Sequence, residues 1–308
     1  MSDQRLLLLD TASLYFRAFF GVPDTLRAPD GTPVNAVRGL MDFISRLTEE
    51  YDPTHLVCCW DDNWRPQWRV DLVETYKSHR VVEEVAGAAD VEEVPDPLQV
   101  QIPIILDVLA AWGITVIGAE DMEADDVIGT LATGAGMPVD VVTGDRDLFQ
   151  LVDDEQQVRI LYTARGVSKH ERVDNAWVRA KYGVEAAQYA DFATLRGDAS
   201  DGLPGVAGVG EKTAASLLTQ FHDVAGIVAA AHDEKSGMAA GPRRRILAAL
   251  DYLEVAPVVV AVRRDLDLDR GSMLRPRQPA DQDAVAALDA TWGLGTSSER
   301  LALALAGN

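Results

Sequence analysis

The sequence predicts an α/β fold with a mostly parallel sheet, followed by a smaller helical unit. In the first half, short apolar or β-branched runs alternate with segments of helical periodicity, which is typical of a parallel sheet flanked by helices. After about Val173 the pattern becomes helical, with Gly and Pro frequent between Gly197 and Gly210. A chain of 308 residues is long for one compact domain, so a large domain plus a smaller one is expected.

The individual elements follow from these patterns in chain order. Strands are predicted at residues 6–9, 55–60, 115–117, 139–143 and 158–162, and helices at residues 34–50, 102–112 and 122–133. The expected domains are residues 1–175, with an unusual connection at about 63–100, and residues 176–260. The segment 261–308 has weak signals and is expected to pack on both domains as helical or irregular structure.

Composition limits the possible functions. A net charge of −21, from 28 Lys and Arg against 49 Asp and Glu, is unusual for a nucleic-acid binder, because phosphates are normally contacted by Lys and Arg. Any DNA-binding surface must therefore be a local basic stripe. Cys58 and Cys59 are adjacent in a strand-like run and are expected to be buried and reduced. The N-terminal apolar run ends at Asp10, so a soluble, cytoplasmic protein is expected.

Acidic residues follow four of the predicted strands. They are Asp10, Asp61, Asp62, Glu123 and Asp145. Because ligands of open α/β sheets bind outside the carboxyl ends of the strands, these acids are expected at one edge. Further acids stand close to them in the sequence or in the first part of the helical unit: Asp125, Asp126, Asp147, Asp198 and Asp201. One such Asp is more often a helix cap, but independent caps would not all fall on the same edge.

This concentration of carboxylates requires cations. Two carboxylates about 5 Å apart repel by roughly 3 kcal/mol at an effective dielectric constant of about 20. Oxygen ligands select hard ions such as Mg²⁺ or Mn²⁺, and the sequence contains no His and Cys set with zinc spacing. The sequence therefore predicts a site for two or more divalent ions.

A glycine-rich segment lies in the helical half, at residues 205–213. The phosphate loop of nucleotide-binding proteins would need Lys directly after the last Gly, but Glu211 intervenes. We interpret Gly208-Val-Gly210 as a helix-hairpin-helix turn, in which backbone N–H groups approach a DNA phosphate and Lys212 adds a cation. A glycine-rich helix end without a ligand is the alternative interpretation.

The connection at residues 63–100 fits neither pattern and is long for a compact domain, which is typical of functional or mobile segments. Four residues of its first half share one face at helical spacing: Arg69, Tyr76, Lys77 and Arg80. Basic residues interleaved with an aromatic suit a single DNA strand, although a solvated amphipathic helix has the same pattern. The second half, from Glu83-Glu84 to Glu92-Glu93, is acidic.

The motifs also occur together in an informative order. They are Leu-Leu-Leu-Asp10 with Tyr15-Phe16-Arg17, Tyr76-Lys77-Ser-His-Arg80, Glu123-Ala-Asp125-Asp126, Thr143-Gly-Asp145-Arg-Asp147, Gly197-Asp198-Ala-Ser-Asp201 and Val209-Gly-Glu-Lys-Thr213. This combination resembles the bacterial and phage 5′ nuclease (flap endonuclease) family, which includes the N-terminal nuclease domain of bacterial DNA polymerase I. The resemblance covers roughly residues 5–260. It implies a stand-alone nuclease with a PIN-like catalytic domain, a helical arch and a helix–three-turn–helix DNA-binding domain.

The resemblance also implies residue roles. Direct or water-mediated metal ligands would be Asp10, Glu123, Asp125, Asp126, Asp145, Asp147, Asp198 and Asp201, together with either Asp61 or Asp62. Lys77 and Arg80 would contact the scissile phosphate. DNA would be bound by Arg17, Arg69, Tyr76, Gly208, Gly210, Lys212 and Thr213, with K⁺ as a further ligand of the hairpin. Two departures from the family are the acidic half of the arch and Gly202, which replaces the usual Asn.

The predicted function is that of a structure-dependent 5′ nuclease, acting as a 5′→3′ exonuclease and flap endonuclease in replication and repair. Two-metal hydrolysis would leave a 5′-phosphate, with Lys77 and Arg80 neutralising the developing charge. The expected partners are DNA 5′ ends and flaps, RNA primers included, and the protein is expected to be a monomer without a membrane partner. The alternatives are a catalytically silent paralogue that binds branched DNA and a Mg²⁺-dependent phosphohydrolase of small molecules.

Overall fold

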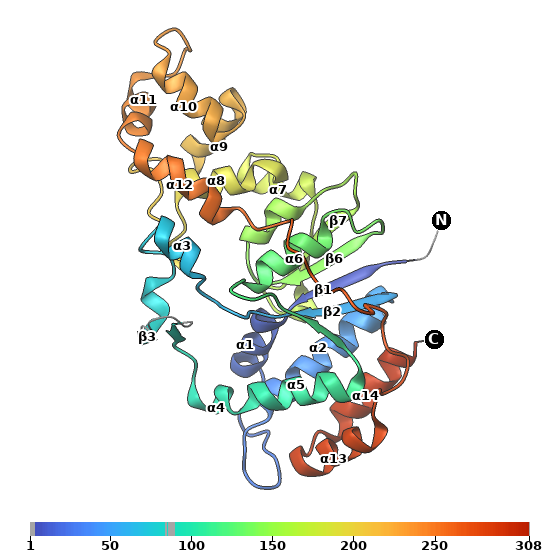
Figure 1. Ribbon diagram of the computed structural model, residues 1–308. Helices are drawn as coiled ribbons and strands as arrows, with labels where there is room; N and C mark the ends of the chain where they lie inside the picture. The colour runs from blue at the N-terminus through green and yellow to red at the C-terminus, as the bar shows by residue number, and fades with distance from the viewer. Residues whose placement is uncertain (1–3, 84, 86–89, 308) are drawn as a thin grey trace.

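A six-stranded sheet forms the centre of the computed structural model, which describes residues 4–83, 85 and 90–307 (Figure 1). The strand order is β5-β2-β1-β6-β7-β8; β7 and β8 pair antiparallel, and the other neighbours pair in parallel. The bounds are β1 Leu6–Asp10, β2 His55–Cys59, β5 Thr115–Ile117, β6 Val139–Thr143, β7 Val158–Tyr162 and β8 Glu171–Val173. The predicted, mostly parallel sheet is thereby confirmed.

Strand β1 shows why the apolar runs become parallel strands. Leu6 and Leu8 pack into the core on one face of the sheet, whereas Leu7 and Leu9 pack into the core on the other. All four side chains are at most 1% exposed. Strands buried on both faces have continuous apolar sequences, and the polar residue that ends the run then marks the sheet edge. In β1 that residue is Asp10.

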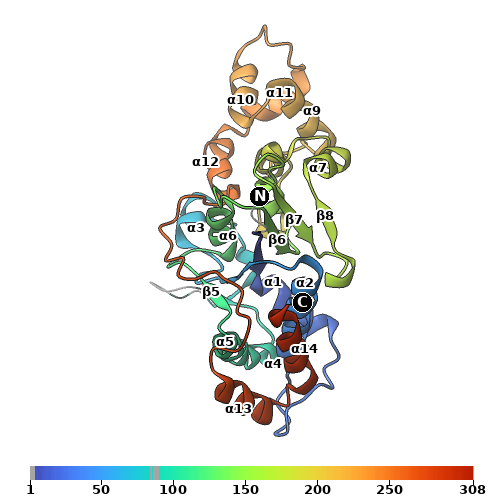
Figure 2. The same cartoon turned by 90° about the vertical axis from the view of Figure 1, so that its right-hand side faces the viewer.

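Helices cover both faces of this sheet (Figures 1 and 2). One face carries α1 Thr11–Gly21, α2 Asn35–Tyr51, α5 Gln101–Trp112, α13 Gln282–Trp292 and α14 Gly295–Ala306. The other face carries α6 Ala124–Ala132 and the 3₁₀ turn η2 Asp147–Leu151. The C-terminal segment, expected to pack as helical or irregular structure, forms α13 against α5 and α14 against α2.

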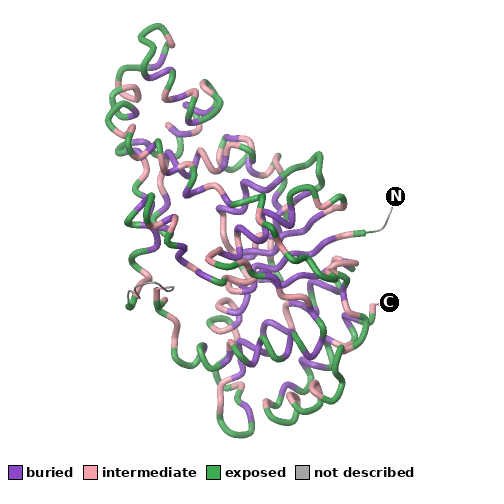
Figure 3. The backbone as a smooth tube through the Cα atoms, viewed as in Figure 1, coloured by how far each residue is buried: buried purple, intermediate pink, exposed green. Residues whose placement is uncertain are grey.

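The smaller helical domain follows in the sequence. Its helices are α7 Asn175–Tyr182, α8 Tyr189–Arg196, α9 Glu211–Phe221, α10 Val224–His232, α11 Ala240–Leu247 and α12 Leu250–Val260. In Figure 1, α9, α10 and α11 stand clear of the sheet, and Figure 3 shows that the buried segments follow the strands. Because α8 packs against both η2 and α12, the helical domain is joined directly to the turn that carries Asp147. A helical domain was predicted, and its boundary near residue 175 stays a prediction.

The arch differs from the single amphipathic helix face that the spacing suggested. Its elements are α3 Gln67–Leu72, the 3₁₀ turn η1 Ser78–Arg80, the antiparallel strands β3 Val81–Glu83 and β4 Val91–Glu92, and α4 Asp96–Gln99. Helix α3 ends before Tyr76, and Lys77 adopts a left-handed conformation with φ of 48°. The prediction that Arg69, Tyr76, Lys77 and Arg80 share one helical face is therefore wrong. Glu84, part of the predicted acidic half, lies outside the described residues.

The base of the arch is docked on the short turn η5, Ala199–Asp201. The Lys77 amide donates to the Asp201 carbonyl (2.9 Å), and the Thr75 hydroxyl donates to the Gly202 carbonyl (2.7 Å). Gly202 has φ of 69°, and a Cβ atom there would lie 2.0 Å from the Thr75 carbonyl oxygen. The approach of the arch therefore requires glycine at position 202.

Several features were not predicted, namely α1, β8, and the division of the C-terminal segment into two helices. Helix α1 begins after Asp10, whose carboxylate caps it by accepting from the Ser13 amide. Cys58 and Cys59 are free and buried, as expected. Within the described residues, no single helix is long and apolar enough to cross a membrane; α9 and α10 reach that length only as a pair bent by 81°.

Candidate active site

Carboxylates from successive strand ends meet at one edge of the sheet, as the sequence predicts. Asp10 ends β1, and its Oδ2 atom accepts a 2.6 Å hydrogen bond from the hydroxyl of Thr143, the last residue of β6. The same hydroxyl accepts from the Asp145 amide at 2.9 Å. Thr143 thus fixes two acids of neighbouring strands relative to each other.

A cavity of about 620 Å³ opens beside these acids. Four carboxylates line its inner wall: Asp10, Asp61, Asp125 and Asp145. Aromatic side chains from α1 and from the residues after β2 form a second wall: Tyr15, Phe16, Trp60 and Trp64. The arch closes the third side with Lys77, Arg80, Asp90, Val91 and Glu92. The cavity therefore lies between the acids of the sheet edge and an arch that contributes both bases and acids.

Burial and mutual repulsion raise the pKa values of acids in this cavity. Burial raises the pKa of Asp10 from its usual 3.8 to about 7, and the Asp61 carboxylate contributes further. Burial also raises the pKa of Asp125 well above its usual value, with Asp145 and Asp10 adding to the effect. Without a cation, the Asp10 carboxyl therefore titrates near neutral pH. Such an arrangement is typical of functional sites.

Asp61 and Asp62 are distinguished by their surroundings. The Oδ1 atom of Asp61 accepts from the Ala124 amide at 2.9 Å, and burial raises the pKa of its carboxyl. Asp62 is exposed, and its carboxylate accepts from the Asp121 amide at 3.0 Å. Both line the cavity, but Asp61 is the one whose charge acts on Asp10.

A second acidic group lies toward the helical domain. Burial raises the pKa of Asp147 well above its usual value, and Asp145 and Asp201 reinforce the shift. The Oδ1 atom of Asp147 is buried without a hydrogen-bond partner among the described residues. Asp198 is paired with Arg196 at 3.0 Å and faces Arg146 at 3.5 Å, and Asp201 faces Arg80 at 3.5 Å.

The donor set fits a hard divalent cation. An orphaned carboxylate oxygen on Asp147 and the mutually repelling acids of the cavity would both be stabilised by positive charge. As they stand, no three His, Cys, Asp or Glu side chains in the described ranges are close enough to hold one ion. Mg²⁺ usually keeps several waters and takes only one or two carboxylates directly, so this spacing suits water-mediated ligation.

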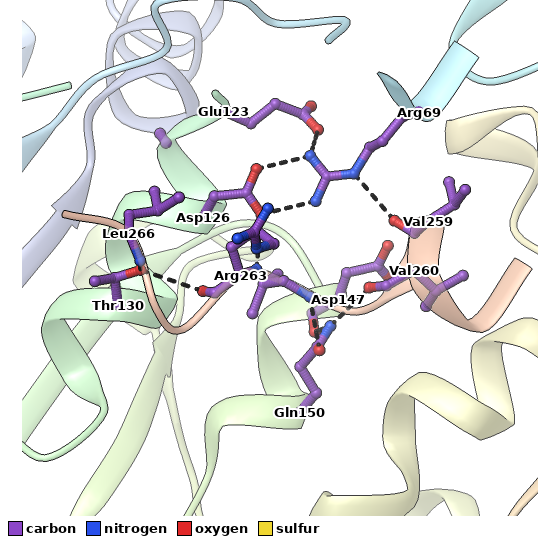
Figure 4. A network of polar contacts seen from close by, with 12 residues as sticks. Arg69, Glu123, Asp126, Thr130, Asp147, Gln150, Val259, Val260, Arg263 and Leu266 are labelled. Carbon is purple, nitrogen blue, oxygen red and sulfur yellow. Dashed lines mark hydrogen bonds and ion pairs between the residues drawn. The ribbon is translucent and has the colours of Figure 1, made fainter. Parts of the chain in front are cut away.

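Two predicted metal ligands, Glu123 and Asp126, and one predicted DNA contact, Arg69, form a buried ion-pair network (Figure 4). The Arg69 guanidinium is 2% exposed and donates to Asp126 at 2.7 Å and to Glu123 at 2.5 Å. Asp126 is 0% exposed, and its oxygens accept hydrogen bonds from Arg69 and from the Arg263 amide. Arg69 and Asp126 neutralise each other in this structure, and the roles of Arg69 in DNA contact and of Asp126 as a metal ligand stay predictions.

Tyr76 and Lys77 also turn inward. The Tyr76 ring is 3% exposed and its hydroxyl donates to Glu123 at 2.7 Å, and the expected contact of Tyr76 with DNA stays a prediction. The Lys77 ammonium pairs with Glu123. Burial lowers the pKa of Lys77, but the Glu123 carboxylate outweighs this and raises the pKa well above its usual value. Lys77 still lines the cavity, and Arg80 keeps 35% of its side chain exposed.

The chain leaving α12 is bound to the same network (Figure 4). The Val259 carbonyl accepts from Arg69 at 3.1 Å. The Gln150 amide nitrogen donates to the carbonyls of Asp147 (2.8 Å) and Val260 (3.1 Å), and its oxygen accepts from the Val262 amide (3.0 Å). Gln150 thus ties the exit of the helical domain to the turn that carries Asp147. Gln150 belongs to the sequence motif that begins at Thr143, but the sequence alone assigned it no role, because its partners after α12 are more than a hundred residues away.

The glycine hairpin is open to solvent. Gly208 and Gly210 are exposed around buried Val209, and Gly210 is the N-cap residue of α9. A Cβ atom at Gly210 would meet nothing within 4 Å, so the backbone there is free to approach a ligand. Lys212 is exposed in the first turn. The missed neighbour is Arg245 of α11, whose Nε atom lies 3.1 Å from a Cβ placed on Gly208.

Comparison with known proteins identifies the family. The 5′-3′ exonuclease N-terminal resolvase-like domain matches residues 5–183, and the 5′-3′ exonuclease C-terminal SAM fold matches residues 184–283. The chain belongs to the 5′-3′ exonuclease family. The membership predicted from the motifs is confirmed, and with it the prediction of a 5′ nuclease.

Full-length relatives support this membership. A 5′-3′ exonuclease of Streptomyces coelicolor is 58% identical over 296 residues, covering 96% of this chain and 98% of that protein. A 5′-3′ exonuclease of Mycobacterium tuberculosis is 49% identical, covering 97% of both chains. The DNA polymerase I of Mycobacterium leprae is 37% identical over 91% of this chain but only 29% of the polymerase.

Solved structures show the same fold at low identity. The bacteriophage T5 flap endonuclease in a complex with DNA and metal ions has a TM-score of 0.66 at 16% identity, covering 98% of this chain and 99% of that one. Human GEN1 with Holliday junction DNA has a TM-score of 0.64 at 16% identity, covering 98% of this chain and 71% of that one. This 5′-3′ exonuclease family member therefore shares the T5 nuclease fold.

Proposed function

We propose that this family member is a structure-dependent 5′ nuclease that removes nucleotides from DNA 5′ ends and cuts 5′ flaps. The observation that carries the proposal is the cavity between the sheet edge and the arch, where Asp10, Asp61, Asp125 and Asp145 face Lys77 and Arg80. A phosphodiester needs such an arrangement, with cation-binding acids on one side and bases for its own charge on the other. The neighbours whose structures contain DNA and metal ions support the same function.

The proposed cations are Mg²⁺ or Mn²⁺, two or more, rather than the zinc named for one T5 exonuclease structure. Asp10, Asp61, Asp125 and Asp145 would hold them in the cavity, with Glu123 beside them. Asp147, Asp198 and Asp201 would supply a second, largely water-mediated group. Bound divalent cations supply a water of lowered pKa and a positive charge for the leaving oxygen.

The arch residues are proposed to receive the scissile phosphate. The Lys77 ammonium forms an ion pair with the Glu123 carboxylate, and the Arg80 guanidinium donates to the Ser200 carbonyl at 2.9 Å. Lys77 already lines the cavity, so its ammonium would be available to the phosphate there if its pair with Glu123 opened. Lys77 and Arg80 would then stabilise the charge that develops on the phosphoryl oxygens. Cleavage is expected to leave a 5′-phosphate.

The hairpin is proposed to hold the duplex. The amides around Gly208 and Gly210 at the N-terminus of α9 face solvent beside Lys212, Thr213 and Arg245, which suits a DNA phosphate. K⁺ at this hairpin is a further proposal. Arg17 lies beside Gly144, with its Nη1 atom 3.5 Å from the Ala164 carbonyl oxygen, and is proposed to contact DNA. Action on RNA primers and a monomeric state are also proposals.

Cleavage of an end-labelled 5′-flap duplex in Mn²⁺, Mg²⁺ or EDTA tests the proposal. We expect metal-dependent release of products from the 5′ end or from the flap junction, and none in EDTA. Competition by unlabelled DNA but not by nucleotides would exclude a phosphohydrolase of small molecules. Tight binding of the flap duplex without cleavage in either metal would instead support a silent branch-binding paralogue.

A further inference from the structure

The acidic hairpin of the arch has no role in the function proposed above, yet it forms one wall of the cavity. Strands β3 and β4 pair with Val81 opposite Glu92, and the Glu93 amide donates to the Arg80 carbonyl at 3.0 Å. Glu92 faces the cavity, whereas Glu93, the next residue along the strand, is exposed. The hairpin thus presents a carboxylate to any strand that passes under the arch.

Glu92 differs from the neighbouring acid Asp90. Asp90 is paired with Arg65 and is structural. Glu92 is half-buried, and among the described residues no ion pair or side-chain hydrogen bond is recorded for it. Burial raises its pKa, while Arg80 and Lys77 act in the opposite direction and Asp61 and Glu123 add to the shift. Glu92 therefore lies between the bases of the arch and the acids of the sheet edge without being neutralised by either.

A 5′ flap and a recessed 5′ end differ in how much chain lies beyond the scissile phosphate. If a flap continues as a single strand through the cavity between sheet edge and arch, its phosphates would pass Glu92, which lines that cavity. A terminal nucleotide extends only a short way. Bound cations would neutralise the acids of the sheet edge, but Glu92 belongs to the arch strand β4. The Glu92 carboxylate would therefore repel the phosphates of the passing strand.

We propose that Glu92 sets the preference of this nuclease for short over long 5′ single strands, by repelling the phosphates of a strand that passes under the arch. This inference rests on the proposed 5′ nuclease function. It assigns a role to the acidic half of the arch, which departs from the family pattern. It also predicts that the charge of Glu92, rather than the general charge of the arch, decides the preference.

The experiment compares Glu92→Gln with the matched control Glu93→Gln, which removes the same charge from the adjacent, exposed position. Single-turnover cleavage in Mn²⁺ is measured on a nicked duplex and on a flap of about ten nucleotides. For E92Q, we expect the flap-to-nick rate ratio to rise about five- to tenfold. For E93Q it should stay within about twofold of wild type. An unchanged ratio in E92Q, or equal increases in both variants, would overturn the inference.

A binding measurement separates this inference from the proposed function. Fluorescence anisotropy in Ca²⁺ gives the affinities for the same flap and nicked duplexes without cleavage. E92Q should tighten flap binding relative to nick binding, and Glu92→Lys should tighten it further. If the wild type cuts neither substrate, the proposed nuclease function fails while this affinity ratio still decides the role of Glu92. An affinity ratio that is the same in wild type, E92Q and E92K refutes it.

Discussion

The base of the arch and the hairpin before α9 were both predicted to bind DNA, but the predicted residues are largely buried at the arch and exposed at the hairpin. At the arch, Arg69 and Tyr76 are 2% and 3% exposed and serve the protein's own carboxylates. At the hairpin, Gly208, Gly210 and Lys212 are exposed, and the neighbouring Glu211 is paired with Arg196 instead. Basic residues near a carboxylate cluster compensate that cluster first, so a basic pattern in the sequence does not by itself identify a DNA surface.

The largest effect is expected from the acids behind the arch. Asp125→Asn should lower cleavage by about a thousandfold or more, because it removes a proposed cation ligand. The affinity for flap DNA should stay within about threefold, since binding is assigned to the hairpin. Single-turnover cleavage and anisotropy measure the two quantities, with exposed Asp71→Asn as the control. Full activity in both Asp125→Asn and Asp145→Asn would remove the cavity from the mechanism.

The inward-turned arch should be important for stability. Arg69→Ala leaves Asp126 buried without its ion-pair partner, which typically costs about 3–5 kcal/mol, while Glu123 keeps Lys77. Arg300→Ala breaks a pair with Asp42 whose side chains are 49% and 38% exposed, and should cost at most about 1 kcal/mol. Urea unfolding of both variants measures the difference. Similar losses in the two would show that Arg69 is not part of a buried network.

The acids of the cavity should make the metal-free protein sensitive to pH. The folded pKa of Asp10 is about 7 against its usual 3.8, so the folded state binds the proton more tightly. Its contribution to stability is fully present below the unfolded pKa and is lost as the pH rises through the folded one. In EDTA, Asp10→Asn should therefore be more stable than wild type by about 2–4 kcal/mol at pH 8 and similar at pH 4. Thermal unfolding of wild type and Asp10→Asn at both pH values measures this difference. A variant that is less stable than wild type at pH 8 would contradict the prediction.

The smallest effect is expected at the hairpin. Lys212→Ala and Arg245→Ala should each weaken duplex binding by roughly three- to tenfold and lower the slope of log affinity against log salt by about 1. Lys235→Ala, which removes an exposed cation from the loop between α10 and α11, should change neither quantity. Equal effects of all three variants would show that general charge, rather than the hairpin, binds DNA.

The fold could be predicted from the sequence wherever burial decides the pattern. The strands β1, β2, β5, β6 and β7 were predicted from apolar runs, because each is covered on both faces. Helix α1 was missed because its beginning depends on Asp10, which was interpreted only as a ligand although its carboxylate also caps the helix. The arch was predicted incorrectly because its conformation depends on contacts with Asp201 and Gly202, more than a hundred residues away in the chain.

The candidate site was predicted to a similar extent. The convergence of Asp10, Asp125 and Asp145 follows from parallel strands that end at one edge. The sequence could not show which acids already had partners. Asp126 and Asp125 are adjacent in one motif, yet Asp126 faces Arg69 and Asp125 faces the cavity. That difference depends on which side of α6 each residue occupies relative to the arch, which is a tertiary property.

The contact at Gly202 has an evolutionary consequence. Since a Cβ atom there would lie 2.0 Å from the Thr75 carbonyl oxygen, any side chain forces the arch away from the turn that carries Asp198 and Asp201. A side chain at position 202 should therefore be accompanied by a different path of the arch base. Residue 202 and the residues around Thr75 should consequently covary among relatives, so that sequences with glycine share the close approach and sequences with Asn share a wider opening.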